Sequence, residues 1–193
     1  MTSFYQDTDI SITENFLTEE EATYLISVAE SVNQSTWRTQ GENSPEVENF
    51  DFWDDKNLFM HKLPDFDREL VLRLEERAHR LYEETYGLEN LGVRYVSINI
   101  IHRFSPGHSM EPHQDRGPHY TNNDIMHGFV IYINDDYLGG EIYYPKKDIS
   151  IKPKARSLVI HPGTEEYTHG VKEVQSGIRY TLTSFSRDPI IDA

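Results

Sequence analysis

Cysteine is absent from this chain of 193 residues. Its absence excludes disulfide bonds, thiolate zinc sites, iron–sulfur clusters and cysteine nucleophiles, so any metal site must use histidine and carboxylate ligands. Long apolar runs are also missing: none reaches the roughly 18 residues that a membrane-spanning helix needs. The first residues lack the basic and apolar segments of a signal peptide. We therefore expect a soluble, cytoplasmic protein with no membrane partner.

Basic residues are scarce. Lys and Arg number 18 against 33 Asp and Glu, which gives a formal net charge of -15. A protein that binds nucleic-acid phosphates needs an excess of positive charge, so we expect no nucleic-acid partner. The hydrophobic fraction of 37% still suffices for a buried core. The length predicts one domain over residues 1–193 and leaves the oligomeric state open.

Helical patterns occupy the N-terminal half of the chain. A capping box followed by an apolar stripe predicts a helix from about Thr18 to Val32. A second apolar stripe predicts a helix from about Asp65 to Tyr86, which Gly87 ends. Both helices are amphipathic, so we expect each of them to pack on another element.

Residues 37–60 connect the two predicted helices and include an acidic stretch, 41–49, that is rich in turn-forming residues. A solvated loop is the simpler interpretation, and a mobile lid over a site is the alternative. The aromatic residues Trp37, Phe52 and Trp53 could form a wall for a substrate. Aromatic residues of a small domain more often belong to its core.

Short β-rich runs separated by Pro, Gly and Asn begin at Val93. About eight short strands at this spacing, after two helices, predict a mainly β protein of the α+β class, with a sandwich or jelly-roll barrel. The expected strands are Arg94–Phe104, Pro112–Asp115, Gly128–Ile133, Glu141–Tyr144, Ile149–Ile151, Ser157–Ile160, Tyr167–Val171 and Ile178–Phe185.

One His-x-Asp motif, His113-Gln114-Asp115, occurs among the nine histidines. A random chain of this composition would contain about 1.5 histidines followed two residues later by Asp or Glu, so the motif alone is weak. Its setting strengthens it, because it follows a Ser-Pro-Gly turn and enters a predicted strand. Residues two apart in a strand share a face, so the imidazole and the carboxylate can bind one metal ion.

A reactive metal needs a third ligand from further along the chain. We favour His169, which begins a predicted strand ten residues before Arg179. Alternation places Arg179 and Thr181 on one face, where a cation and a hydroxyl would suit a buried carboxylate ligand. Alternatively, Arg179 pairs with a protein carboxylate on a solvated face. The other candidate ligands are His119, His127 and His161.

In order and spacing, these motifs resemble the prolyl 4-hydroxylase-like branch of the Fe(II)- and 2-oxoglutarate-dependent dioxygenases, over about residues 10–187. The resemblance implies a double-stranded β-helix (jelly-roll, cupin-like) over about residues 91–187, supported by two main helices within about residues 10–90. The motifs that carry it are Asn15–Glu21, Phe104–Gly107, His113-x-Asp115, Tyr132–Asp135, Gly139-Gly140-Glu141, Pro145, Pro153, Ser157–Val159, His169 and Arg179.

The resemblance also implies the roles of individual residues. Arg179 would bind the distal carboxylate of 2-oxoglutarate, with Thr181 and Tyr132 forming hydrogen bonds beside it. Fe(II), 2-oxoglutarate and O2 would take part, with ascorbate as an optional addition, and a prolyl residue of a peptide or protein would be hydroxylated with release of succinate and CO2. The implied metal ligands, which are also the catalytic residues, are His113, Asp115 and His169.

Two residues depart from the family pattern: Phe104 and Met110 stand where relatives commonly carry tyrosines near the co-substrate, and neither can donate a hydrogen bond. His161 is expected to be structural. His108, His119 and His127 are expected to lie at the surface or in the core more often than at a substrate entrance.

Other functions stay open at this point. One alternative is hydroxylation of another side chain or of a small molecule. A second is a non-catalytic jelly-roll interaction module, which the intact His-Asp-His set and Arg179 disfavour. A third, a cupin-like metal-binding protein, would be expected to carry a His-x-His motif, and the chain has none.

Overall fold

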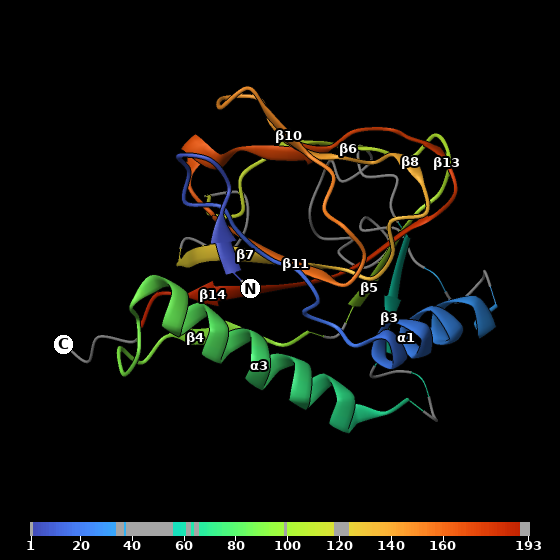
Figure 1. Ribbon diagram of the computed structural model, residues 1–193, viewed down its shortest axis with the longest axis horizontal. Coiled ribbons are helices and arrows are strands. Elements are labelled where there is room, and N and C mark those ends of the chain that lie inside the picture. Colours follow the sequence, from blue (N-terminus) through green and yellow to red (C-terminus); the bar gives the residue numbers. More distant parts are fainter. Residues whose placement is uncertain are drawn as a thin grey trace.

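The computed structural model describes residues 2–33, 37, 56–60, 63, 66–98, 100–117 and 124–189. Two β-sheets lie face to face, and two helices cover the outer face of the larger sheet (Figure 1). All strand pairs in these residues are antiparallel. The expectation of a mainly β jelly-roll supported by two helices is therefore confirmed. None of the described helices is long and apolar enough to span a membrane.

The larger sheet carries the helices on one face and the interior of the barrel on the other. β4 (Arg94–Val96) pairs with the C-terminal end of β14. The remaining strands lie in the order β1 (Thr2–Phe4), β2 (Ser11–Thr13), β11 (Ser157–Pro162), β7 (Ile125–Tyr132), β14 (Arg179–Arg187), β5 (Ile100–Phe104) and β3 (Lys56–Phe59).

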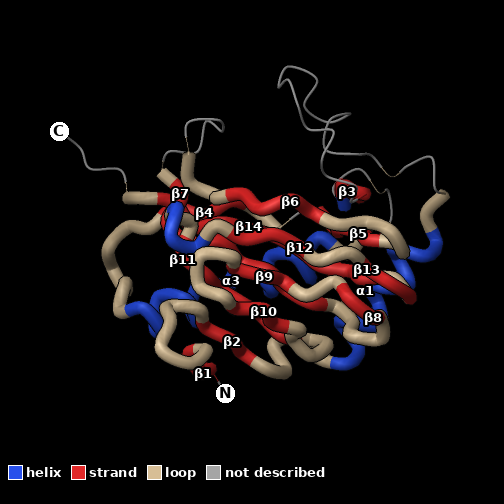
Figure 2. The backbone as a smooth tube through the Cα atoms, turned by 90° about the horizontal axis from the view of Figure 1, so that it is seen from above, coloured by secondary structure: helices blue, strands red, loops and turns tan. Residues whose placement is uncertain are grey.

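The smaller sheet closes the barrel on the opposite side (Figure 2). A short 3-10 helix, Glu165–Tyr167, leads into its strand β12. A separate pair of strands, β8 (Leu138–Gly139) and β13 (Val174–Ser176), flanks this sheet. The strand order of the smaller sheet is β10 (Ile149–Ile151), β9 (Ile142–Tyr144), β12 (His169–Val171) and β6 (Met110–His113).

The first helix, α1 (Glu19–Ser31), begins at the predicted capping box. The Thr18 hydroxyl accepts a hydrogen bond from the Glu21 amide at 3.1 Å, and the Glu21 carboxylate accepts one from the Thr18 amide at 2.9 Å. These two bonds satisfy amides that have no partner inside the helix. The prediction of Thr18–Val32 therefore agrees with the structure to within one residue at each end.

The second helix, α3 (Arg68–Tyr86), ends at Gly87 as predicted. Gly87 adopts φ of 66°, a left-handed conformation that glycine accommodates without strain. The start of the helix was predicted at about Asp65, but Asp67 caps it: the Asp67 carboxylate accepts a hydrogen bond from the Leu70 amide at 3.1 Å.

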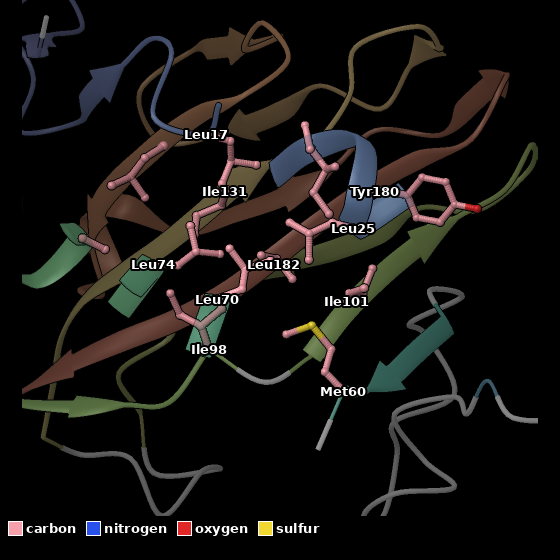
Figure 3. Close-up of a cluster of buried hydrophobic side chains, with 14 of the residues drawn as sticks. Leu17, Leu25, Met60, Leu70, Leu74, Ile98, Ile101, Ile131, Tyr180 and Leu182 are labelled. Atoms are coloured by element: carbon pink, nitrogen blue, oxygen red, sulfur yellow. The ribbon is translucent and has the colours of Figure 1, made fainter. Parts of the chain in front are cut away.

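Both helices pack through leucines on the outer face of the larger sheet (Figure 3). Leu25 of α1 and Leu74 of α3 have no exposed surface. An ion pair of 2.7 Å between Arg77 and Glu21 links the helices, and the Arg77 guanidinium lies over the Phe16 ring. Other members of this cluster are Leu17, Leu70, Ile98, Ile101, Ile131, Tyr180 and Leu182.

Some strands differ from the prediction. The expected strand Arg94–Phe104 is divided into β4 and β5, because the Ile98 amide donates to the Glu75 carboxylate of α3 at 2.7 Å instead of to a neighbouring strand. The short strands β1, β2 and β3 were not predicted. They have three or four residues each, too few to show a periodic pattern.

Part of the predicted loop 37–60 is the strand β3. Trp37 is buried against Tyr180, with their ring centroids 6.4 Å apart, so it belongs to the core. Phe52, Trp53 and the acidic stretch 41–49 lie outside the described residues, and the lid interpretation stays a prediction.

Candidate active site

The inner face of the larger sheet brings the predicted co-substrate residues together. Directly opposed residues of antiparallel strands share a face. Arg179 of β14 lies opposite Phe104 of β5, and Thr181 lies between His102 and Tyr132 on its two neighbours. The pairing therefore places all five side chains on the face that looks toward the smaller sheet.

The predicted metal ligands come from the smaller sheet and the loop after β6. His113 ends β6 and lies opposite His169, which begins β12. Asp115 follows two residues after His113, and its Oδ1 lies 3.9 Å from Nε2 of each of the two histidines. One ligand atom from each of the three residues lies within 4.8 Å of the others. The structure thus gathers the three ligands around one point.

Backbone carbonyls orient both imidazole rings. Nδ1 of His113 lies 3.0 Å from the carbonyl oxygen of Glu111, and Nδ1 of His169 lies 3.1 Å from that of Tyr167. A carbonyl oxygen only accepts hydrogen bonds, so Nδ1 carries the proton in each ring. Each Nε2 then offers its lone pair toward Asp115, which is the arrangement that a metal-binding histidine uses.

The charge balance of this cluster fits a divalent cation. Burial raises the pKa of Asp115 to about 6, although the charge of His113 opposes this rise. Burial lowers the pKa of His169 to about 4, which keeps its imidazole neutral at pH 7. Among the described residues, the buried Oδ2 of Asp115 has no hydrogen-bond partner. Two imidazole nitrogens and one carboxylate oxygen form the donor set that suits Fe(II) with open positions.

Arg179 is a buried cation, with 2% of its surface exposed. No Asp or Glu of the described residues forms an ion pair with it, so the alternative of a solvated ion pair is wrong for this part of the chain. Its guanidinium donates to the Tyr132 hydroxyl at 3.2 Å and to the Thr181 hydroxyl at 3.4 Å, and lies over the rings of Phe104 and Tyr132. A buried cation with neutral neighbours is a binding site for an anionic group.

A cavity of about 210 Å³ joins the two clusters. It reaches from Arg179 and Thr181 to the three predicted metal ligands, and its walls are mostly apolar. Phe104 and Met110 both line it, and neither provides a hydrogen-bond donor. The other lining residues include Ile100, His102, Ile125, Gly128, Phe129, Val130, Ile142, His161, Val171, Thr183 and Phe185.

The sequence prediction missed two features of this cavity. His161 was expected to be structural without a role at the site, yet it lines the cavity, with its ring 4.2 Å from that of His169. His102 and Thr183 form a polar pair in the wall, with Nε2 and Oγ1 2.7 Å apart. Alternation along β11 is the sequence signal that could have placed His161 on the inner face. In the structure it lies there, opposite Gly128 of β7.

Two further histidines of the described residues lie away from the predicted metal ligands. His127 points to the outer face of the larger sheet, where its Nδ1 lies 2.8 Å from the Tyr82 hydroxyl. His108 accepts a hydrogen bond from the Ser105 amide through Nδ1 and is not part of the cavity wall. His119 lies outside the described residues.

The family model of the 2OG-Fe(II) oxygenase superfamily matches residues 99–187. This range contains the three predicted metal ligands and the three residues of the predicted co-substrate site. None of the curated protein sequences matches this chain.

Solved structures share its fold at low sequence identity. The viral collagen prolyl hydroxylase vCPH of Paramecium bursaria Chlorella virus-1, in complex with 2OG, superposes with a TM-score of 0.70 at 14% identity, covering 94% of this chain and 97% of the other. A Trichoplax adhaerens prolyl hydroxylase, in complex with a hypoxia inducible factor peptide fragment, gives 0.74 at 19% identity, covering 94% and 84%. A Pseudomonas putida prolyl-4-hydroxylase gives 0.65 at 16%, covering 94% of each chain.

Proposed function

We propose that this chain is a member of the 2OG-Fe(II) oxygenase superfamily that hydroxylates a prolyl residue in a peptide or protein and consumes 2-oxoglutarate and O2. The observation that carries the proposal is a single cavity with a His-Asp-His cluster on one wall and a buried arginine without an acidic partner in the described residues on the other. A 2-oxo acid with a second carboxylate needs both of these groups.

His113, Asp115 and His169 would hold Fe(II) through two imidazole nitrogens and one carboxylate oxygen. When bound, Fe(II) supplies the redox chemistry by which O2 decarboxylates 2-oxoglutarate to succinate and CO2 and hydroxylates the substrate. Three protein ligands on one side leave positions for the co-substrate and for O2. The carbonyls of Glu111 and Tyr167 keep both imidazoles in the tautomer that binds metal.

Arg179 would hold the distal carboxylate of 2-oxoglutarate. Its fork of N–H groups matches a carboxylate, and its burial strengthens the attraction because little water screens the charges. Tyr132 and Thr181 already contact the guanidinium, so they fix its direction and can add hydrogen bonds to the same carboxylate. The apolar side chains of Phe104 and Met110 exclude water between this end and the metal ligands.

A prolyl substrate is supported by two observations. The solved structures that share this fold include prolyl hydroxylases, one of them in complex with a peptide fragment. The walls beside the predicted metal ligands include Ile125 and Phe185, which suit the apolar ring of proline. The net charge of -15 favours a neutral or basic peptide over an acidic one.

The test is an incubation of the protein with Fe(II), 2-oxoglutarate, ascorbate and a panel of proline-containing peptides under isotopically labelled dioxygen. We expect one peptide to gain a single labelled oxygen atom on proline, with one succinate formed for each hydroxylation. Asp115→Ala and the same peptide with alanine in place of proline are the controls. Succinate formation without any peptide product would redirect the search to another substrate class, and hydroxylation by Asp115→Ala would contradict the proposed site.

A further inference from the structure

We propose that His161 is a positioning residue for the metal site: it holds the second carboxylate oxygen of Asp115, so that Asp115 presents one oxygen to the metal. The inference rests on the proposed function, because it concerns the same metal ligands. It assigns a role to a buried histidine that is not one of the three predicted ligands.

His161 is fixed in place inside the barrel. It lies in β11 with 1% of its surface exposed. Its ring meets the His169 ring at a centroid distance of 4.2 Å and an angle of 67°, and the Tyr144 ring at 5.7 Å and 71°. Two edge-to-face contacts therefore restrict its rotation. Its Nδ1 is buried and has no hydrogen-bond partner among the described residues.

The two oxygens of Asp115 have different surroundings. Oδ1 faces Nε2 of His113 and Nε2 of His169, each at 3.9 Å. Oδ2 faces Nδ1 of His161 at 4.0 Å and is also buried without a partner. A buried donor and a buried acceptor thus lie next to each other, and each is costly to leave unsatisfied. A shift of about 1 Å would bring them to the usual 2.7–3.2 Å of a hydrogen bond.

Gly128 of β7 leaves the space in which this pair sits. A Cβ atom added at Gly128 would lie 2.5 Å from Oδ2 of Asp115 and 2.9 Å from Nε2 of His161. Both distances are shorter than atoms tolerate, so no side chain fits behind the carboxylate. Among the described residues, the imidazole of His161 faces Oδ2 from this side of the sheet.

Control of Oδ2 has a consequence for the number of open metal positions. A carboxylate that binds a metal through both oxygens occupies two positions, whereas one that binds through a single oxygen occupies one. If Oδ2 is held by His161, Asp115 contributes Oδ1 alone. Two histidines and one oxygen would then leave open metal positions for the 2-oxo acid and O2.

The experiment is an anaerobic titration of the metal-free protein with Co(II), a spectroscopic substitute for Fe(II), without 2-oxoglutarate. His161→Phe keeps the ring shape and removes the donor, while His161→Gln keeps an N–H donor. His108→Phe is the matched control, because His108 lies near β6 and outside the cavity wall. Visible absorption gives the affinity, and thermal melting of the metal-free proteins shows whether each variant is folded.

We expect His161→Phe to weaken Co(II) binding about 10- to 100-fold, as loss of a partner that orients a metal ligand usually does. His161→Gln should recover most of this loss, and His108→Phe should bind like the wild type. Wild-type affinity in a folded His161→Phe would overturn the inference, because packing alone would then explain the ring. If His161→Phe does not fold, a folded His161→Gln with a loss of more than about 10-fold would overturn it. A wild-type protein that binds no Co(II) would instead overturn the proposed function.

Discussion

Tyr180 and Leu182 point from β14 into the apolar cluster beneath α1 and α3, whereas Arg179 and Thr181 of the same strand point into the cavity. All four residues are at least 97% buried. On the outer face, burial removes apolar surface from water and stabilises the fold by about 1.5–3 kcal/mol for each large side chain. On the inner face, burial encloses charged and polar atoms that cost stability unless they gain a partner.

Successive side chains of β14 point to opposite faces of the sheet. The same strand therefore contributes to stability through one face and to ligand binding through the other. The inner face contains buried atoms without partners, among them Nε of Arg179 and Oδ2 of Asp115. Natural proteins retain buried polar atoms without a protein partner where a bound ligand or metal supplies that partner. We therefore expect substitutions on the two faces to have opposite signatures: loss of binding with stability retained on the inner face, and loss of stability with binding retained on the outer face.

The largest effect on binding is expected for Asp115→Ala. It removes one of the three predicted metal ligands, and it also removes a carboxylate whose pKa burial has raised to about 6. We expect loss of detectable Fe(II) or Co(II) binding, together with an unchanged or higher free energy of unfolding of the metal-free protein. Titration calorimetry and urea unfolding give the two quantities. If this variant bound metal with the affinity of the wild type, Asp115 would not be a metal ligand.

Arg179→Ala should act on the co-substrate and leave the metal in place. Loss of one partner of a buried, charge-assisted contact typically costs about 2–5 kcal/mol, so the Kd for 2-oxoglutarate should rise by at least about 30-fold. Metal affinity in the absence of 2-oxoglutarate should stay within a few-fold of the wild type. Both are measured anaerobically on the same preparation. An unchanged Kd for 2-oxoglutarate would place the carboxylate site elsewhere.

Leu182→Ala tests the outer face of the same strand. Leu182 has no exposed surface, and truncation of a buried leucine usually lowers the free energy of unfolding by about 2–5 kcal/mol. Chemical denaturation measures this loss. Co(II) affinity of the folded variant should remain within a few-fold of the wild type. A large loss of metal affinity without loss of stability would show that the two faces are not independent.

The smallest expected effect is on the pH dependence of the free energy of unfolding, through His127 on the outer face of the larger sheet. Burial lowers the pKa of His127 to about 4 from its ordinary value of about 6.5, with the charge of Asp9 opposing. Between about pH 4 and pH 6.5 the unfolded chain therefore binds more protons than the folded chain. The contribution, at most about 3 kcal/mol, is complete above pH 6.5 and disappears as the pH falls toward 4. The unfolding free energy of His127→Phe should fall less steeply over this range, whereas an equal slope in His108→Phe and His127→Phe would contradict the assignment.

The helices and the His113-x-Asp115 pair could be picked out from the sequence because their signals are local. A capping box marks the start of α1, a glycine marks the end of α3, and His113-x-Asp115 lies within three consecutive residues. The predicted role of Arg179 came from alternation along one strand and from the family resemblance. The structure places Arg179 in one cavity with the predicted metal ligands.

Features that depend on pairing between distant segments could not be predicted in the same way. β2 pairs with β11, which lies more than a hundred residues further along the chain, and β3 pairs with β5. Neither β2 nor β3 is long enough to show a periodic pattern. The position of His161 beside Asp115 depends on the register of β11 against β7, which places it opposite Gly128. The sequence shows which face of its own strand His161 occupies, but it does not show which strand lies next to it.

The central claim is that the inner face of the barrel binds Fe(II) and the 2-oxo acid together. Its most direct test is an anaerobic titration of the metal-free protein with Fe(II) and then 2-oxoglutarate, followed by visible absorption. We expect a saturable charge-transfer band of a chelated 2-oxo acid that is absent in Asp115→Ala and requires a much higher 2-oxoglutarate concentration in Arg179→Ala. A folded protein that takes up metal but gives no band with 2-oxoglutarate would contradict the account.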